Sequence, residues 1–242
     1  KNEGYKGAMF PWQSGSNGRE ESQHIHLNPK SGRWIPDNTH LQRHVNVAIA
    51  FNIWQYYQVT RDSEFLSFYG AEMFLEIACF WASKASYNSG KERFEILKVV
   101  GPDEYHTGYP DSNAPGINNN AYTNVMVAWT LIHAQKILDI LSNRRRGELM
   151  KRLNISNNDL EYWDEISRKL FVPFIKDGII SQFEGFEDLK ELDWHKYHDK
   201  YGEILRLDRI LESEDDDVNC YQASKQADVL MLFYLFSSEK IS

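Results

Sequence analysis

The chain has 242 residues, a formal net charge of −8 and an aromatic content of 14%. This length is enough for one large domain with a substantial hydrophobic core. The acidic balance argues against a nucleic-acid partner, because a surface that binds the phosphate backbone should be basic.

Most of the first 36 residues show neither helical nor strand periodicity. Residues 10–21 mix Gly, Ser and Asn with aromatic and charged side chains, and such a long loop in a compact chain is usually functional or disordered. Phe10 and Trp12 argue against disorder, because disordered segments contain few aromatic residues.

The runs 24–27 and 33–35 alternate apolar and polar residues with the period of a strand, and they predict a small hairpin. His24 and His26 would face one side of this hairpin. We interpret them as solvated side chains, and a pair of metal ligands is the alternative.

The next two elements are predicted helices at residues 41–57 and 64–85. Apolar residues cover nearly the whole surface of the first helix, which predicts burial on most sides. Asp37 or Asn38 is expected to cap it. The short link at 60–62, with Asp62 or Ser63 as the next cap, predicts an αα-hairpin.

The rest of the chain continues the helical pattern. The predicted elements are a strand at 92–100, an apolar helix at 121–141, an amphipathic helix at 158–170, a short hairpin at 174–183 and an apolar helix from 224 to 236. Residues 184–217 are expected to be acidic and irregular, with a solvated run at 212–217. Arg144, Arg145 and Arg146 are interpreted as a solvated helix end. Paired helices buried on two sides indicate concentric helical layers.

The block Gly101-Pro102-Asp103-Glu104-Tyr105-His106 places two acids, an aromatic ring and an imidazole side by side. Gly and Pro indicate that the backbone leaves regular structure here. A loop held by rigid elements is a usual place for a catalytic carboxylic acid. The alternative is a proline-initiated turn with solvated acids. A second polar and aromatic block at 118–124 follows directly, which favours the functional interpretation.

Cys79 and Cys220 lie far apart, without the spacing of a metal site, and favour a reducing compartment. We find no signal peptide at the start and no apolar run of transmembrane length. These observations predict a cytoplasmic location and no membrane partner, although residue 1 need not be the natural start.

Four blocks of the sequence resemble glycoside hydrolase family 65, which includes maltose, kojibiose and trehalose phosphorylases and related hydrolases. The blocks are Pro11-Trp12-Gln13-Ser14 with Gly18 and Glu20, the 101–106 block, residues 119–124, and residues 224–230. They occur in the family's order across essentially the whole chain. The resemblance implies an all-α (α/α)6 barrel with minor β-structure in loops. Residues 1–242 are then expected to be a segment of that single catalytic domain, truncated at both ends.

The resemblance implies that Glu104 is the general acid in an inverting cleavage of α-linked glucosides such as trehalose, maltose or kojibiose. Inverting cleavage needs one carboxylic acid to protonate the leaving oxygen. The neighbouring Asp103 and the ring of Tyr105 favour the protonated form of Glu104. Hydrolysis and phosphorolysis both stay open at this point.

The resemblance also implies that Lys225 and Gln226 contact the non-reducing-end sugar. Lys225 can donate to hydroxyls, and Gln226 can both donate and accept. The alternative for this pair is a helix N-terminus with solvated side chains. The other substrate-binding candidates in the matching blocks are Trp12, Glu20, Asn120 and Tyr122. Trp12 suits a sugar platform, and a core tryptophan is the alternative.

Two family features have no counterpart in this chain. An upstream aromatic and acidic block that binds the same sugar is missing. The chain also ends before the loop that binds phosphate in phosphorylases or supplies the base in hydrolases. The chemistry needs no metal and no cofactor, with inorganic phosphate as co-substrate in a phosphorylase. The loop at 109–116 and the 203–212 region resemble the hydrolase-like branch, which is often fused to a phosphatase-type domain.

Two functions therefore stay open. The first is an enzyme that acts on a small-molecule α-glucoside, with a homodimer as one option for its assembly. The second is an inactive carbohydrate-binding or scaffold fragment. A terpenoid- or peptide-processing toroid lacks support, because the sequence contains no Asp-rich or His-Glu-x-x-His metal motif on a helix.

Overall fold

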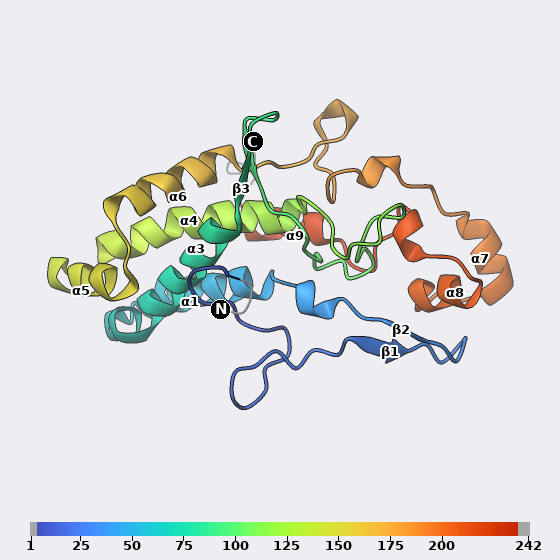
Figure 1. Cartoon of the computed structure of the whole chain (residues 1–242), viewed down its shortest axis with the longest axis horizontal. Coiled ribbons are helices and arrows are strands. Elements are labelled where there is room, and N and C mark those ends of the chain that lie inside the picture. The colour runs from blue at the N-terminus through green and yellow to red at the C-terminus, as the bar shows by residue number, and fades with distance from the viewer. Residues whose placement is uncertain (1–3, 237–242) are drawn as a thin grey trace. The chain divides into compact units, whose positions relative to one another are not determined.

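The computed structural model describes residues 4–236, which are mostly helical with two short antiparallel hairpins (Figure 1). The chain divides into two compact units. Unit 1 comprises Lys1–Phe10, Arg43–Leu97 and Thr123–Val172. Unit 2 comprises Pro11–Gln42, Lys98–Tyr122 and Pro173–Ser242. Each unit therefore combines segments that are distant in the sequence.

Unit 1 holds most of the long helices. They are α1 (Val45–Thr60), α2 (Ser63–Phe65), a π-helical turn (Leu66–Gly70), α3 (Ala71–Lys84), α4 (Ala121–Ile140, from its third residue), α5 (Asn143–Leu153) and α6 (Asn157–Lys169). The predicted helices at 41–57, 64–85, 121–141 and 158–170 are confirmed with shifted ends. Asp62 accepts a hydrogen bond from the backbone N–H of Phe65 at 2.8 Å, which confirms it as a cap. Arg144, Arg145 and Arg146 lie in the first turn of α5, which agrees with the predicted helix end.

Helix α1 differs from its prediction at its start and in its burial. It begins at Val45, because Thr39–Leu41 form a separate 3₁₀ turn whose first N–H donates to Asp37 at 2.8 Å. Its buried residues lie toward one side and are Asn46, Val47, Ala50 and Ile53. Val59 is 81% exposed, so the prediction of burial on most sides is wrong for this helix.

Helix α3 supplies much of the core of unit 1, and Phe74, Leu75 and Trp81 are fully buried. The continuous stretch Ser63–Lys84 is also long and apolar enough to cross a membrane by length and composition. This corrects the expectation that no run has transmembrane length. In the structure 56% of its most apolar window is buried, as in a core helix of a soluble protein.

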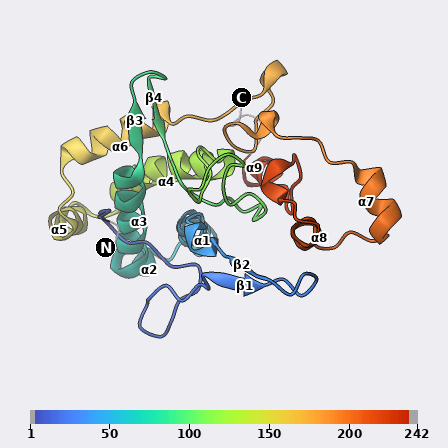
Figure 2. The ribbon, with the colours of Figure 1, turned by 45° about the vertical axis from the view of Figure 1, so that its right-hand side comes forward.

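The strand predicted at 92–100 is much shorter in the structure. Strand β4 (Arg93–Glu95) pairs antiparallel with β3 (Ser86–Asn88), and this hairpin follows directly on α3 (Figure 2). Lys98 adopts a left-handed φ of 56°, a conformation that cannot continue a strand.

Unit 2 begins with the hairpin predicted from the alternating runs. Strand β1 (Ile25–Leu27) pairs antiparallel with β2 (Trp34–Pro36), with His26 opposite Ile35. The turn expected near 177–178 is also present, as a 3₁₀ turn (Lys176–Gly178) between Phe174 and Ile180, which form a bridge. Further 3₁₀ turns lie at Phe186–Asp188 and Val218–Cys220.

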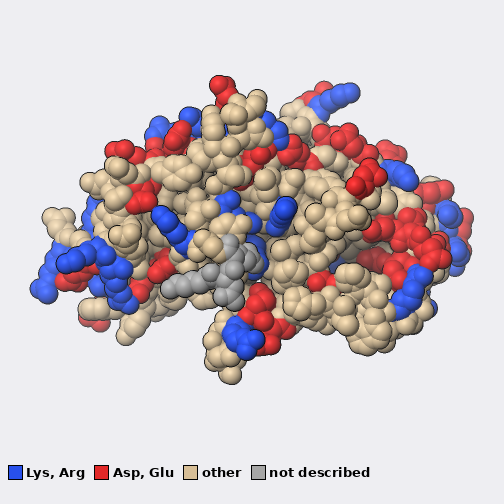
Figure 3. All heavy atoms as spheres, viewed as in Figure 1, with Lys and Arg blue, Asp and Glu red and all other residues tan. Residues whose placement is uncertain are grey.

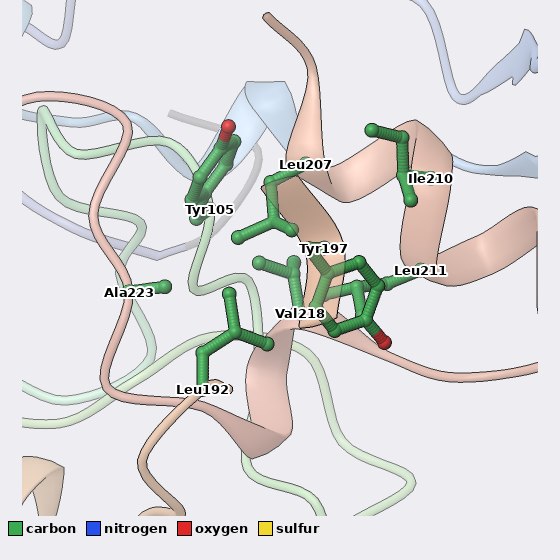
Figure 4. Packing of buried hydrophobic residues seen from close by; sticks show 8 residues of the cluster. All are labelled: Tyr105, Leu192, Tyr197, Leu207, Ile210, Leu211, Val218 and Ala223. Carbon is green, nitrogen blue, oxygen red and sulfur yellow. The ribbon is translucent and has the colours of Figure 1, made fainter. Parts of the chain in front are cut away.

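The prediction of an irregular 184–217 segment is wrong. It contains α7 (Trp194–Tyr201) and α8 (Leu207–Ser213). Side chains from both helices meet Tyr105 in a buried cluster (Figure 4). The cluster consists of Tyr105, Leu192, Tyr197, Leu207, Ile210, Leu211, Val218 and Ala223. These apolar residues are scattered among charged ones, which concealed the helical period in the sequence.

The acidic run at 212–217 is also not simply solvated. Glu212 accepts hydrogen bonds from Ser31 and from Arg33, both at 2.6 Å, and so connects α8 to the β1–β2 hairpin. Asp216 accepts from the Tyr221 hydroxyl at 2.7 Å, and Asp217 caps the last 3₁₀ turn. Figure 3 shows carboxylates gathered over the face where α7 and α8 lie. These acids therefore hold the unit together as well as giving it charge.

Helix α9 (Asp228–Leu235) begins four residues later than predicted. Residues 224–227 stay outside the helix, where two of them make contacts with other segments of unit 2. The Ser224 hydroxyl donates to Gln182 at 2.6 Å, and the Lys225 N–H donates to Asp103 at 2.7 Å. The 101–106 block and the 224–230 block are thus brought together.

Candidate active site

The 101–106 block forms a tight turn in unit 2. The N–H of Glu104 donates to the carbonyl of Gly101 at 3.2 Å, and Glu104 adopts a left-handed φ of 66°. The next side chain, Tyr105, is 7% exposed and packs into the buried cluster with α7 and α8. The turn therefore leaves the Glu104 side chain partly exposed, at 27%, beside a fixed neighbour.

Asp103 connects this turn to the segment before α9. Its Oδ2 accepts from His106 Nδ1 at 2.8 Å and from the N–H groups of Tyr105 and His106 at 3.3 and 3.4 Å. Its Oδ1 accepts from the Lys225 N–H at 2.7 Å. Asp103 is only 2% exposed. One buried carboxylate thus fixes both the backbone around Glu104 and the start of the Lys225 segment.

His106 completes this buried network. Its Nε2 lies 2.9 Å from the carbonyl oxygen of Tyr221, which can only accept, so Nε2 carries a proton. Its Nδ1 lies 2.8 Å from an oxygen of Asp103, so both ring nitrogens have a hydrogen-bond partner. The ring packs against Phe183 and Phe186, with centroid separations of 4.9 and 5.5 Å. The network is closed to water on this side, and His106 is 1% exposed.

Glu104 forms an ion pair with the ammonium group of Lys225, 121 positions later in the chain. Two residues that the family resemblance places at the substrate are therefore in direct contact. The expectation that Asp103 and Tyr105 favour the protonated form of Glu104 stays a prediction. The structure adds Lys225 as a charged neighbour of Glu104 and directs the Asp103 carboxylate toward His106.

A second buried acid, Asp228, lies at the start of α9. It is 0% exposed, and it accepts hydrogen bonds from Asn120 Nδ2 at 3.0 Å and from the Val229 N–H at 2.8 Å. Burial raises the pKa of Asp228 to about 6, the charge of Asp103 adds to this, and the bond from Asn120 opposes it. A Cβ at Gly101 would lie 2.5 Å from Asn120 Nδ2 and 3.1 Å from an Asp228 oxygen. The 101–106 turn therefore requires glycine at this position.

Glu104 also lines a pocket of about 770 Å³ within unit 2. Its walls come from the β1–β2 hairpin and the turn after it, the loop at 104–115, α8 and the segment that follows α8. Gln42, Arg206 and Asp208 line it as well. Among the described residues, no group of three or more His, Cys, Asp or Glu is placed to hold a metal ion.

Residues 1–241 match the glycosyl hydrolase family 65 central catalytic domain. The chain belongs to glycosyl hydrolase family 65. It is 53% identical over 238 residues to an uncharacterized glycosyl hydrolase of Mycobacterium tuberculosis, covering 98% of this chain and 18% of that protein. It is 40% identical over 242 residues to the trehalose 6-phosphate phosphorylase of Lactococcus lactis, covering 100% and 30%.

Two further family 65 comparisons agree with this assignment. The kojibiose phosphorylase of Halothermothrix orenii is 38% identical over 245 residues, covering 98% of this chain and 29% of that protein. A solved structure of a human-microbiome protein superimposes with a TM-score of 0.71 at 26% identity, covering 96% and 29%. The chain thus spans 18% to 30% of the length of these relatives. Its largely helical fold matches that of the solved relative.

The other family 65 candidates lie at different depths in the structure. Asn120 and Tyr122 are buried, at 0% and 5% exposure, and burial followed by the charge of Asp228 raises the pKa of Tyr122. Gln226 is exposed beside Lys225, and its carbonyl accepts from the Asp228 N–H at 3.0 Å. None of these three lines the pocket beside Glu104.

The 10–21 loop of this family 65 chain is ordered, as predicted. Glu20 holds it together, accepting from the Trp12 N–H at 3.2 Å and from the Ser22 hydroxyl at 2.5 Å. Trp12 is half-buried, and neither Trp12 nor Glu20 lines the pocket beside Glu104. Their roles as substrate contacts stay predictions.

No sequence pattern indicated roles for His106, Asp228 or the pocket residues Gln42, Arg206 and Asp208. A charged residue that opens an otherwise apolar helix, as Asp228 does, is a pattern that could have been singled out. Arg206 and Asp208 lie in the segment that was predicted to be irregular. No helical periodicity indicated there that a helix would form part of the pocket wall.

Proposed function

We propose that the full-length protein containing this chain cleaves an α-glucoside by inverting phosphorolysis, with Glu104 as general acid. The chain would contribute a segment of the catalytic (α/α)6 barrel. The observation that carries the proposal is the Glu104–Lys225 pair, which joins two family 65 blocks at one site. The names of the relatives from Lactococcus lactis and Halothermothrix orenii favour phosphorolysis.

In this mechanism protonated Glu104 gives its proton to the glycosidic oxygen while the bond from C1 to that oxygen breaks. A phosphate oxygen forms a new bond to C1 from the opposite face, which inverts the configuration and yields β-glucose 1-phosphate. The proton that the attacking phosphate releases restores Glu104 by way of solvent. Lys225 stabilises the carboxylate that Glu104 becomes after proton transfer, and this state corresponds to the ion pair described above.

The buried acids have a supporting role in this proposal. Asp103 and His106 fix the turn that carries Glu104, and the buried Asn120 donates a hydrogen bond to Asp228. Its role as a substrate contact stays a prediction. Lys225 and Gln226 are proposed to bind hydroxyls of the non-reducing-end glucose. Trp12, Glu20 and Tyr122 stay substrate-binding predictions, as do a cytoplasmic location and a homodimer.

Hydrolysis is the second candidate, because the Mycobacterium tuberculosis relative at 53% identity is named a glycosyl hydrolase. Here water would attack C1 in place of phosphate, and the sugar released would be β-glucose. Product analysis with and without inorganic phosphate separates the two reactions. Turnover that requires phosphate and yields β-glucose 1-phosphate supports phosphorolysis.

The general acid is tested with Glu104→Gln in the full-length protein, assayed on trehalose, kojibiose and maltose. The change keeps size and removes the transferable proton, so kcat should fall by about 10²–10⁴-fold. A glucosyl fluoride needs no protonation of its leaving group and should be the least affected. Glu161→Gln, an exposed acid on α6, is the matched control and should leave activity unchanged.

Activity of Glu104→Gln within a few-fold of wild type on all three disaccharides would show that Glu104 is not the acid. A wild-type protein that binds these sugars without releasing product, with or without phosphate, would favour the inactive carbohydrate-binding alternative.

A further inference from the structure

The pocket beside Glu104 is rich in hydrogen-bond acceptors. We call it the acceptor-rich pocket; its volume of about 770 Å³ lies within the roughly 300–1,000 Å³ typical of small-molecule sites. Its acidic lining residues are Asp37, Glu104, Asp208, Glu212, Asp216 and Asp217. Arg206 is the lining residue with a permanent positive charge among those described.

The guanidinium group of Arg206 already forms an ion pair with the carboxylate of Asp208. Arg206 Nε and Nη2 donate to the two oxygens of Asp208 at 2.9 and 2.6 Å, a bidentate pair. Burial works against ionisation of Asp208, but the hydrogen bonds and charge of Arg206 hold its pKa below the usual range. The Ser31 hydroxyl likewise holds the pKa of Glu212 below its usual range. The pocket wall is therefore negatively charged at neutral pH, with its arginine neutralised.

An uncharged acceptor in the same wall points to a ligand that donates hydrogen bonds. Gln42 lines the pocket and is 4% exposed, and its side-chain oxygen has no hydrogen-bond partner among the described residues. A buried polar atom without a partner costs free energy and calls for an explanation. A ligand hydroxyl that donates to Gln42 would provide one once the side chain turns its oxygen, which is shielded from solvent, toward the pocket.

We infer that the acceptor-rich pocket binds the leaving part of the substrate, and that this part is an uncharged polyhydroxylated compound rather than a sugar phosphate. The inference rests on the proposed function, because it is Glu104 that places the leaving group here. Each hydroxyl can donate to a carboxylate or to Gln42, whereas a phosphate group offers acceptors and negative charge. Tyr109 also lines the pocket and is partly exposed, and its ring suits the apolar face of a sugar.

This inference separates the chain from a close relative. The Lactococcus lactis protein, 40% identical, is named for trehalose 6-phosphate. A phosphate in the acceptor-rich pocket would meet like charges, and this repulsion weakens its binding. We therefore expect the full-length protein to prefer trehalose or kojibiose to trehalose 6-phosphate by at least about tenfold in kcat/KM.

The experiment measures kcat/KM for trehalose and for trehalose 6-phosphate with the wild-type protein and with the variants Asp208→Asn and Asp199→Asn. Removing the charge of Asp208 frees Arg206 for an anion, so the preference for trehalose should narrow by about tenfold. Asp199 is an exposed acid on α7 outside the pocket, and its variant should keep the wild-type preference. Raising the salt concentration should also narrow the preference in wild type, because salt screens charge repulsion.

Binding keeps the inference testable if catalysis fails. Calorimetric titration of wild-type protein should detect glucose and not glucose 6-phosphate. If the protein turns over no α-glucoside, the proposed function is wrong. Selective binding of glucose would even then support the inference that the acceptor-rich pocket takes an uncharged sugar. If Asp208→Asn does not fold, the inference is tested by the wild-type preference for trehalose over trehalose 6-phosphate and by the change of this preference with salt. Equal or tighter binding of glucose 6-phosphate, or faster turnover of trehalose 6-phosphate, would overturn the inference.

Discussion

Replacing Asp228 by Asn should stabilise the full-length protein more at neutral pH than in acid. Asp228 is fully buried, and its carboxylate receives hydrogen bonds from Asn120 and from the Val229 N–H. Burial is the main reason that its pKa is raised to about 6. Asn keeps the shape and one acceptor, and it carries no charge at any pH.

The direction follows from proton linkage. Because the folded pKa lies above the unfolded one, the stability that protonated Asp228 contributes is present below the unfolded pKa of 3.8 and is lost as the pH rises through 6. The two pKa values differ by about 2 units, which corresponds to about 3 kcal/mol at neutral pH. About 2 kcal/mol of this falls between pH 4 and pH 7. Losing one acceptor should cost Asn about 1 kcal/mol at every pH.

Urea unfolding of wild type and Asp228→Asn at pH 4 and pH 7 measures this difference. The change in unfolding free energy caused by the substitution should be more favourable at pH 7 by about 2 kcal/mol. Asp199→Asn, an exposed acid, should change stability by less than about 0.5 kcal/mol at both pH values. An Asp228→Asn variant that is equally destabilised at pH 4 and pH 7 would refute the reasoning.

Three further predictions concern the 101–106 turn and the 10–21 loop. Gly101→Ala should lower the free energy of unfolding by about 1–3 kcal/mol, because its Cβ would meet Asn120. Gly147 lies in α5 with open space around it, so Gly147→Ala should raise the free energy of unfolding by up to about 1 kcal/mol. Thermal unfolding of both variants measures these changes. His106→Phe keeps the aromatic packing and leaves Asp103 without its ring partner. The turn that carries Glu104 should then be less well held, so kcat should fall by at least about tenfold in initial-rate assays. An unchanged kcat would show that His106 does not position Glu104. Glu20→Ala should open the 10–21 loop, which limited proteolysis would detect as new cleavage there; an unchanged digest would show that the loop holds without this carboxylate.

The long helices could be predicted because their apolar residues are dense enough to need no tertiary information. Helix α4 is an example. The cap at Asp62 could be predicted for another local reason, because Asp is a preferred residue at a helix N-terminus. Helices α7 and α8 could not be predicted in this way. Their buried residues, such as Tyr197 and Leu211, are separated by charged ones, and burial depends on Tyr105 from a distant segment. That contact is invisible in a local window of sequence.

The candidate site shows the same division. Glu104 and Lys225 were singled out because their blocks resemble those of a family, and the structure brings the two side chains together. The acceptor-rich pocket was missed, because Gln42 and Asp208 lie in stretches without a motif, and only the fold places them beside Glu104. The sequence also could not show that Asp103 faces His106, since adjacent residues in a turn can point in different directions.

The left-handed backbone of Glu104 has a consequence for how this position can change. A residue with a Cβ is strained at a φ of 66°, and glycine is not. Glu104→Gly should therefore relax the turn while it removes the proposed acid. If Glu104 is the general acid, its loss would then come with a gain in conformational stability, so a selection for thermal resistance alone would favour an inactive variant. A screen for more stable variants of this protein should therefore include an activity measurement, because it would otherwise tend to remove the proposed acid.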